Sequence, residues 1–232
     1  NIALANAALI YHPIADLALK ISGGIENRDD RTDSYTTTRF KNSNGSASVG
    51  TTQFTSLLSE TTLTYDKTFS GKHHLSAVGG FTYQDFLNTS LGGSGVGFLS
   101  DVFQTDDLGA AETPGFPGSG YSKSVLLSYL GRVNYSYANK YLATASFRAD
   151  GSSKYSSNQK WGYFPSVALA WHASEEHFLK NNSLISDLKV RGSWGLTGSQ
   201  ASDAYATLDQ LGAGKTVFGD ALYPTFSPRT TL

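Results

Sequence analysis

The sequence predicts an all-β protein, an antiparallel transmembrane β-barrel segment with short periplasmic turns and long extracellular loops. Polar and apolar residues alternate over segments of about ten residues, aromatic residues stand at both ends of these segments, and very short turns alternate with long polar stretches. The alternation is clearest between residues 141 and 150. There, Tyr141, Ala143, Ala145, Phe147 and Ala149 share one face of the predicted strand, and Thr144, Ser146, Arg148 and Asp150 share the other.

Two tryptophans measure the length of the next apolar stripe. Trp161 and Trp171 lie on the same face of one predicted strand. At about 3.3 Å per residue and a tilt of roughly 40°, they are about 25 Å apart along the barrel axis, the height of the apolar band in outer-membrane barrels. Strands of soluble β-sandwiches are usually only about 5 or 6 residues long. We therefore expect a membrane girdle made of Tyr135, Tyr137, Tyr141, Trp161, Tyr163 and Trp171.

Composition agrees with a barrel and argues against other classes. No stretch approaches the roughly 20 consecutive apolar residues of a membrane-spanning helix. The mean hydropathy of -0.25 is low, as expected when half of every strand faces a wet lumen. A net charge of -1 without a basic cluster argues against nucleic-acid binding. The chain has no methionine and no signal segment, so we expect it to be a piece of a longer chain.

Eight strands are expected, joined by connections that alternate between short and long. Polar loops are predicted at residues 29–52 and 89–121, and the second is long enough to carry function. One helical turn is predicted at Glu175–Phe178, and residues 204–232 are expected to form a long loop with a strand that cannot be placed. In an outer-membrane barrel the long loops face the exterior. The predicted strands are residues 2–11, 16–27, 53–67, 73–88, 122–137, 141–150, 161–173 and 187–196.

A set of motifs after residue 121 resembles the SusC/RagA family of TonB-linked outer-membrane transporters. The motifs follow the family's order and are specific as a set, whereas the region before residue 121 matches in layout more than in letters. They are Ser-Tyr-Leu-Gly-Arg-Val-Asn-Tyr-Ser-Tyr at 128–137, Arg-Ala-Asp-Gly-Ser-Ser at 148–153, Trp-Gly-Tyr-Phe-Pro-Ser at 161–166, Ile-Ser-Asp-Leu-Lys-Val-Arg at 185–191 and Gly-Leu-Thr-Gly-Ser-Gln at 195–200.

The resemblance implies a barrel of about 22 strands closed around an N-terminal plug, located in the cell outer membrane. It also implies active import of oligosaccharides or peptides. The implied partners are a SusD-like surface lipoprotein and the TonB–ExbB–ExbD complex, which acts through an N-terminal part. Residues 1–232 would then be a partial TonB-dependent receptor β-barrel domain, with the plug and N-terminal domains lying outside this sequence.

Five polar residues are candidates for contact with substrate or plug. Four of them, Arg132, Asn134, Arg148 and Arg191, are expected to face the lumen by their parity, and Arg148 and Asp150 form a charge pair before a turn built on Asp-Gly. A turn that fixes the strand register is the simpler interpretation of this pair. Because charges near a plug need partners, we expect these residues to hold the assembly together more than to select substrate.

No catalytic residue, metal site or cofactor is expected, and the chain is not expected to be an enzyme. It has no cysteine and no serine in a nucleophile elbow with a matching triad. His73 and His74 point to opposite faces of a strand. Asp101 and its acidic neighbours lack the ligand spacing of a calcium loop.

Two alternatives to the importer stay open at this point. A passive porin or an adhesin barrel would use the same two-faced wall without TonB. A soluble β-sandwich binding module would instead bury the aromatic stripe, and the isolated chain would stay in solution without detergent. The barrel interpretation predicts aggregation, since an isolated arc has two raw edges and a bare lipid face.

Overall fold

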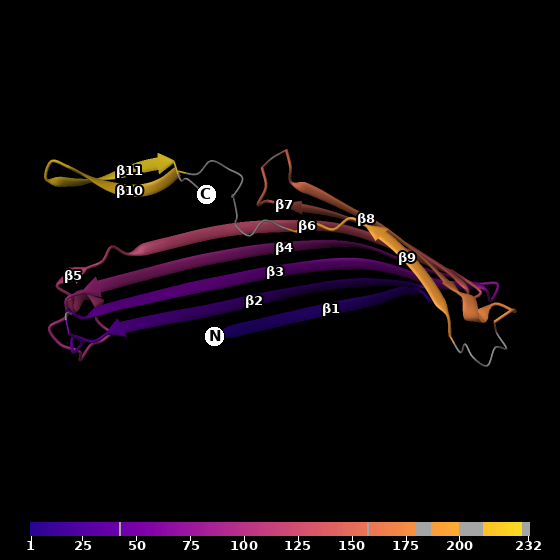
Figure 1. Ribbon diagram of the computed structural model, residues 1–232, viewed down its shortest axis with the longest axis horizontal. Coiled ribbons are helices and arrows are strands. Elements are labelled where there is room, and N and C mark those ends of the chain that lie inside the picture. The colour runs from indigo at the N-terminus through magenta and orange to yellow at the C-terminus, as the bar shows by residue number, and fades with distance from the viewer. Residues whose placement is uncertain (42, 157, 180–186, 200–210, 229–232) are drawn as a thin grey trace. The chain divides into compact units, whose positions relative to one another are not determined.

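The computed structural model describes residues 1–41, 43–156, 158–179, 187–199 and 211–228, most of them in long strands (Figure 1). Among these residues, no helix is long and apolar enough to cross a membrane. The elements are β1 (Ile2–Ile14), β2 (Leu17–Thr36), β3 (Ser46–Phe69), β4 (His73–Val96), η1 (Leu108–Ala110), β5 (Thr113–Pro114), β6 (Gly118–Tyr137), β7 (Tyr141–Ser152), β8 (Trp161–His172), η2 (Ala173–Glu175), β9 (Lys189–Gly195), β10 (Leu211–Phe218) and β11 (Ala221–Pro228).

Strands that follow each other along the chain also lie next to each other in the main sheet. Its order is β1-β2-β3-β4-β6-β7-β8-β9, and the short strand β5 pairs with β4 (Figure 1). Strands β10 and β11 form a separate two-stranded antiparallel sheet. This up-and-down order confirms the predicted all-β antiparallel class and the eight expected strands of the wall. The number of strands in a complete barrel remains a prediction.

The long loops are shorter than the sequence predicted. The loop expected at 29–52 is reduced to residues 37–45, since β2 and β3 extend into it from both sides. The loop expected at 89–121 is reduced to residues 97–117 and contains η1 and β5. The prediction of their boundaries was therefore wrong. The alternation of short and long connections is as expected from β1 to β7, but it ends there, because the β8–β9 connection at 173–188 is longer than the β7–β8 connection at 153–160.

Polar residues on both faces of the extended strands explain this error. In β2, Arg28 pairs with Glu26 at 3.0 Å, and Arg31 pairs with Asp33 at 2.9 Å. Each pair joins residues two apart, which lie on the same face of a strand. Where both faces carry polar side chains the apolar alternation disappears, although the backbone ladder continues. The sequence therefore resembles a loop at these positions.

Three smaller differences concern a proline, a helical turn and a hairpin. Strand β1 continues through Pro13, where a turn was predicted; β1 is an edge strand of the sheet, and edge strands tolerate proline because they pair with a neighbour on one side only. The predicted helical turn at Glu175–Phe178 occurs slightly earlier, as η2. The strand that could not be placed after residue 204 is the β10–β11 hairpin.

Tight turns join β3 to β4 and β6 to β7. Ser70 and Gly71 have φ values of 50° and 63°, and Ala138 and Asn139 have φ values of 50° and 57°. In the second turn, the Lys140 N–H donates to the carbonyl of Tyr137 at 2.9 Å. Two consecutive residues with positive φ define the turn type whose twist matches paired strands. These turns therefore set the register of the strands that follow.

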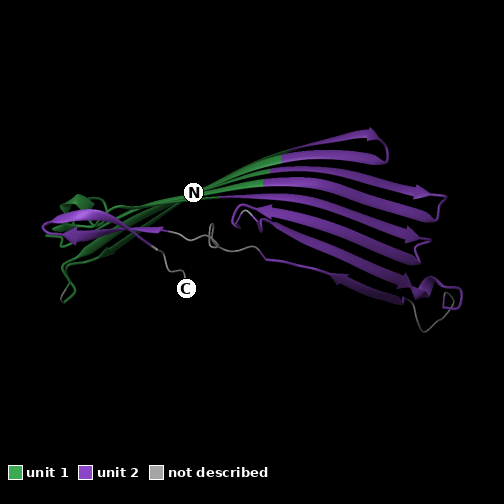
Figure 2. Cartoon of the chain, turned by 90° about the horizontal axis from the view of Figure 1, so that it is seen from above, with its two compact units in different colours: residues 1–7, 23–58, 84–123 green, residues 8–22, 59–83, 124–232 purple. Residues whose placement is uncertain are grey.

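The described chain divides into two compact units (Figure 2). Unit 1 holds both long loops, and unit 2 holds the tight turns and strands β7–β9. Residues 1–7, 23–58 and 84–123 form unit 1, and residues 8–22, 59–83 and 124–232 belong to unit 2.

A small apolar cluster fills the loop region of unit 1. Ala47, Phe98 and Ala111 are buried, and Tyr35 and Leu108 pack against them. The cluster needs a close approach of the two loops, and glycine makes this possible. Gly97 N donates to the carbonyl of Gly45 at 3.0 Å, and both glycines have positive φ, at 84° and 75°. Other residues adopt this conformation only with strain.

One carboxylate, that of Asp101, ties the two loops together. It accepts hydrogen bonds from the hydroxyls of Thr37 and Tyr35, both at 2.6 Å, and from Thr38 through its N–H at 2.9 Å and its hydroxyl at 3.0 Å. Arg39 adds an ion pair at 3.6 Å. The hydrogen bonds from Thr37, Tyr35 and Thr38 hold the pKa of Asp101 well below its usual range. Asp101, which the sequence analysis considered only as a calcium ligand and rejected, therefore anchors the loop region.

Replacing Asp101 by alanine should loosen both loops at once. Removing the carboxylate leaves the donors of residues 35, 37 and 38 without their acceptor. We expect faster backbone hydrogen exchange in residues 37–45 as well as in residues 97–112 of the full-length protein. Asp106→Ala, at an exposed position of the same loop, is the matched control. Loosening confined to residues 97–112 would contradict this account.

Candidate functional site

The register of β6–β9 sorts their side chains into two faces. Tyr137 pairs with Tyr141, Tyr141 with Trp171, and Trp171 with Val190. Paired residues of neighbouring strands point to the same side of a sheet, so this row of rings belongs to one face, which we call the apolar face. The Tyr137 and Tyr141 rings are 6.5 Å apart.

A second aromatic row crosses the same face further along the strands. Tyr129 pairs with Ala149, and Ala149 with Tyr163; Gly151 pairs with Trp161 one step beyond. The Tyr129 and Trp161 rings are 6.0 Å apart. Five of the six predicted girdle residues therefore lie in or beside two rows at the ends of the apolar face, and Tyr135 lies one step inside the first row. Their contact with lipid stays a prediction.

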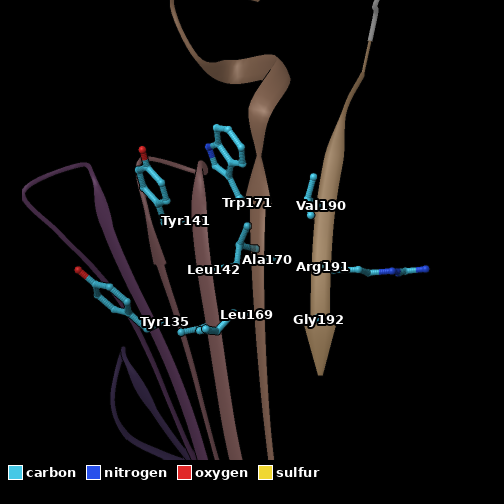
Figure 3. Close-up of a pocket in the computed structure, with 10 residues that line it drawn as sticks. Tyr135, Tyr141, Leu142, Leu169, Ala170, Trp171, Val190, Arg191 and Gly192 are labelled. Carbon is cyan, nitrogen blue, oxygen red and sulfur yellow. The ribbon is translucent and has the colours of Figure 1, made fainter. Parts of the chain in front are cut away.

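Large apolar side chains between the two rows are exposed. Val167, Leu169 and Trp194 retain 51%, 67% and 59% of their accessible surface. A shallow hollow of about 450 Å³ lies between Tyr135 and Trp171, and Figure 3 shows these rings on one side of the ladder while Arg191 extends in a different direction. A contiguous apolar surface of this kind needs a cover of lipid or protein.

The turn after β8 anchors the first aromatic row. Glu176 accepts hydrogen bonds from the Tyr141 hydroxyl at 2.7 Å, the Lys140 ammonium at 2.9 Å and the Trp171 indole N–H at 3.4 Å. The hydrogen bonds from Tyr141 and Lys140 lower the pKa of Glu176 to about 2. The sequence analysis placed this residue in a predicted helical turn and missed its role in holding the rings.

The opposite face of the same ladder, which we call the polar face, carries the candidate contact residues. Arg132 pairs with Ser146, Asn134 with Thr144, and Ser146 with Ser166. On β9, Arg191 pairs with Ala170, which has the same parity on β8 as Ser166. The structure therefore places the following predicted residues on one face, as their parity indicates: Arg132, Asn134, Arg148, Asp150 and Arg191.

Arg148, Asp150 and Asn134 already form hydrogen bonds with neighbouring side chains of the sheet. Arg148 Nε donates to both carboxylate oxygens of Asp150 at 2.8 Å, and its Nη2 donates to Ser128 at 3.2 Å. Asn134 Oδ1 accepts a hydrogen bond from the Thr144 hydroxyl at 2.9 Å. Since an exposed ion pair contributes only about 0–1 kcal/mol, the Arg148 pair orients side chains more than it stabilises the sheet.

Two cations of the polar face are unpaired, and a third was missed. In the described part of the chain, neither Arg132 nor Arg191 forms an ion pair. Lys189 lies two residues before Arg191 on the same face, because it pairs with His172. The parity rule that selected Arg191 would also have found Lys189.

Comparison with curated proteins finds TonB-dependent receptors. The chain is 34% identical over 93% of its length to TonB-dependent receptor P3 of Formosa agariphila. It is 35% identical over 70% of its length to receptor P26 of the same organism, and 44% identical over 47% to TonB-dependent receptor SusC of Bacteroides thetaiotaomicron. It spans only 22%, 17% and 11% of these three proteins. No family model matches the chain.

Comparison with solved structures finds the same fold. The chain superposes on the RagAB peptide transporter with a TM-score of 0.86 and 24% identity, covering 98% of this chain and 26% of that chain. The RagAB peptide importer in its closed-closed state gives a TM-score of 0.85 at 24% identity, with 97% and 25% covered.

Together, the two-faced antiparallel sheet and these matches define the class of protein. The chain is a fragment of the TonB-dependent receptor class. Within this class it is of the SusC/RagA type, as the motifs of residues 128–200 indicated.

The contacts of Glu176 should depend on pH in the acidic range. Because its pKa is lowered from 4.5 to about 2, the folded state favours the charged carboxylate, and this stabilisation is present above pH 4.5 and is lost as the pH falls toward 2. We expect the fluorescence of Trp171, taken as the difference between the full-length protein and its W171F variant, to change across this range. The E176Q variant should not show the transition, and a transition of equal size in E176Q would contradict the assignment.

A charge placed on each face should separate the two environments. Ala145 lies on the apolar face and Ala168 lies on the polar face of the neighbouring strand. Ala145→Arg should destabilise the full-length protein in lipid vesicles by about 2–4 kcal/mol, as arginine does near a bilayer midplane. Ala168→Arg is the matched control and should have a much smaller effect on the free energy of unfolding. Equal effects would show that the apolar face does not contact lipid.

Proposed function

We propose that this chain forms part of the wall and exterior loops of an outer-membrane importer that takes up large nutrients, oligosaccharides or peptides, with energy supplied through TonB. The observation that carries the proposal is the pairing of an exposed apolar face, bounded by aromatic rows, with a polar face on the same strands. A lipid bilayer outside and a wet lumen inside would satisfy both faces.

The sequence relatives support import that is driven through TonB over passive diffusion. They are TonB-dependent receptors, whereas a passive porin or an adhesin would not need TonB. A soluble β-sandwich would bury side chains such as Val167 and Leu169, which are exposed. The passive barrel stays as the second candidate for the whole protein, because the two-faced sheet of this chain would serve equally well in a barrel without TonB.

The partners follow from the same proposal. A SusD-like surface lipoprotein would cover the exterior mouth, near the loops that Asp101 joins, and the TonB–ExbB–ExbD complex would act through an N-terminal part outside this sequence. On the polar face, the five candidate contact residues would meet the plug or the cargo. On the apolar face, the aromatic rows would lie at the two membrane interfaces, where their polar tips reach water.

Uptake should require cellular energy. We expect cells that carry the full-length protein to accumulate a fluorescent oligosaccharide or peptide mixture, and to lose this uptake when a protonophore collapses the proton gradient or when TonB is deleted. A strain without the protein is the background control. Uptake that persists unchanged without TonB would favour the passive pore, and surface binding without uptake would favour the adhesin.

A further inference from the structure

A continuous trough crosses the polar face of β6–β9. One hollow of about 680 Å³ contains Arg132 and a second hollow of about 520 Å³ contains Lys189 and Arg191. The two hollows share Ala168 and Ser193, which pair across β8 and β9. The two hollows are therefore one surface, which we call the polar trough, with cations toward both ends.

The polar trough is rich in positive charge and lacks negative charge. No carboxylate of the described residues lines either hollow. Asp150, the nearby acid, is held by both of its oxygens on Arg148 at 2.8 Å and lines a different hollow. Arg132, Lys189 and Arg191 thus give the trough a positive electrostatic potential.

Hydroxyl groups cover the floor between these cations. Thr144, Ser146, Ser166 and Ser193 line the trough, and the hydroxyls of Ser146 and Ser166 are hydrogen-bonded at 2.6 Å. Hydroxyls both donate and accept, so they can bind peptide N–H and C=O groups as well as carboxylates. The floor is therefore suited to an extended polar ligand.

Most aromatic side chains of β6–β9 lie on the apolar face and not in the trough. Phe164 is the ring that the polar face contributes to the trough, and it lies so close to Gly162 that a Cβ there would be 2.8 Å from the ring. The two aromatic rows belong to the apolar face. Sugar rings stack on flat aromatic surfaces. Phe147 and Trp194 also border the hollow, but the register places both on the apolar face. The lining therefore favours a peptide over an oligosaccharide.

We propose that the polar trough binds the acidic side chains of peptide cargo on the import path. This inference rests on the proposed import function and adds a cargo class to it. Guanidinium groups match carboxylates in geometry and charge. The cations lie on β6 and β9, the two outer strands of the trough, and this separation suits an extended peptide with several acidic side chains better than a single anion.

Two peptides of the same length, one with glutamates and one with glutamines at the same positions, test the proposal. Uptake would be measured in cells carrying the full-length protein with its partners. We expect uptake of the glutamate peptide to fall about threefold in Arg132→Gln or Arg191→Gln and about tenfold in the double variant, as exposed charge pairs at separate sites predict. Uptake of the glutamine peptide should not change. Lys72→Gln, in an exposed tight turn outside the trough, is the control.

The other outcomes would overturn the inference in different ways. An equal loss of both peptides, with a lower melting temperature, would mean that the cations pair with carboxylates of the protein itself. The same variants would also be tested with an oligosaccharide that carries uronate groups. If only the uptake of this oligosaccharide falls, the trough binds acidic sugars instead of peptides. If the variants import both peptides as fast as the unmodified protein does, the inference fails and the import function stands. If the unmodified protein imports no peptide and no oligosaccharide, the proposed function itself fails.

Discussion

The rest of the structure depends on the hydrogen-bond register of neighbouring antiparallel strands. Side chains alternate with a period of two, so a slip by one residue would move every side chain to the opposite face. In β7, a slip would place Arg148 and Asp150 among Tyr129 and Tyr163, and Phe147 over the hydroxyls of the trough. The two faces, the aromatic rows and the trough are therefore consequences of one pairing pattern.

Several local features hold this register. The positive φ values at Ala138 and Asn139 fix the β6–β7 turn, and Glu176 joins the start of β7 to the end of β8 through Tyr141 and Trp171. Proline is accommodated at the end of a ladder. The carbonyl of Pro165 accepts a hydrogen bond from Leu196 N at 3.0 Å, so this side of Pro165 faces β9. The N–H that proline lacks would point to the same side. The last pair of the β8–β9 ladder is Ser166 with Gly195, so Pro165 lies just beyond it.

The loop region follows a different physical logic from the wall. The wall exposes its apolar side chains and satisfies its backbone through the ladder, whereas the loops bury a small apolar cluster and satisfy their polar groups through Asp101. Such a loop region has a defined shape without lipid. A rigid loop loses less conformational entropy when it binds another molecule than a flexible loop does.

The sequence by itself determined the class of fold, the faces of the strands and the identity of the family. These follow from local periodicity and motifs, because side-chain alternation is a property of each strand alone. Only the tertiary structure decided where the strands end, since β2 continues through residues that are polar on both faces. Among the described residues it also decided which charges form an ion pair: Arg148 is paired with Asp150, whereas Arg132, Lys189 and Arg191 form none and line one trough. Pairing between strands sets these contacts, and no single segment of sequence contains that information.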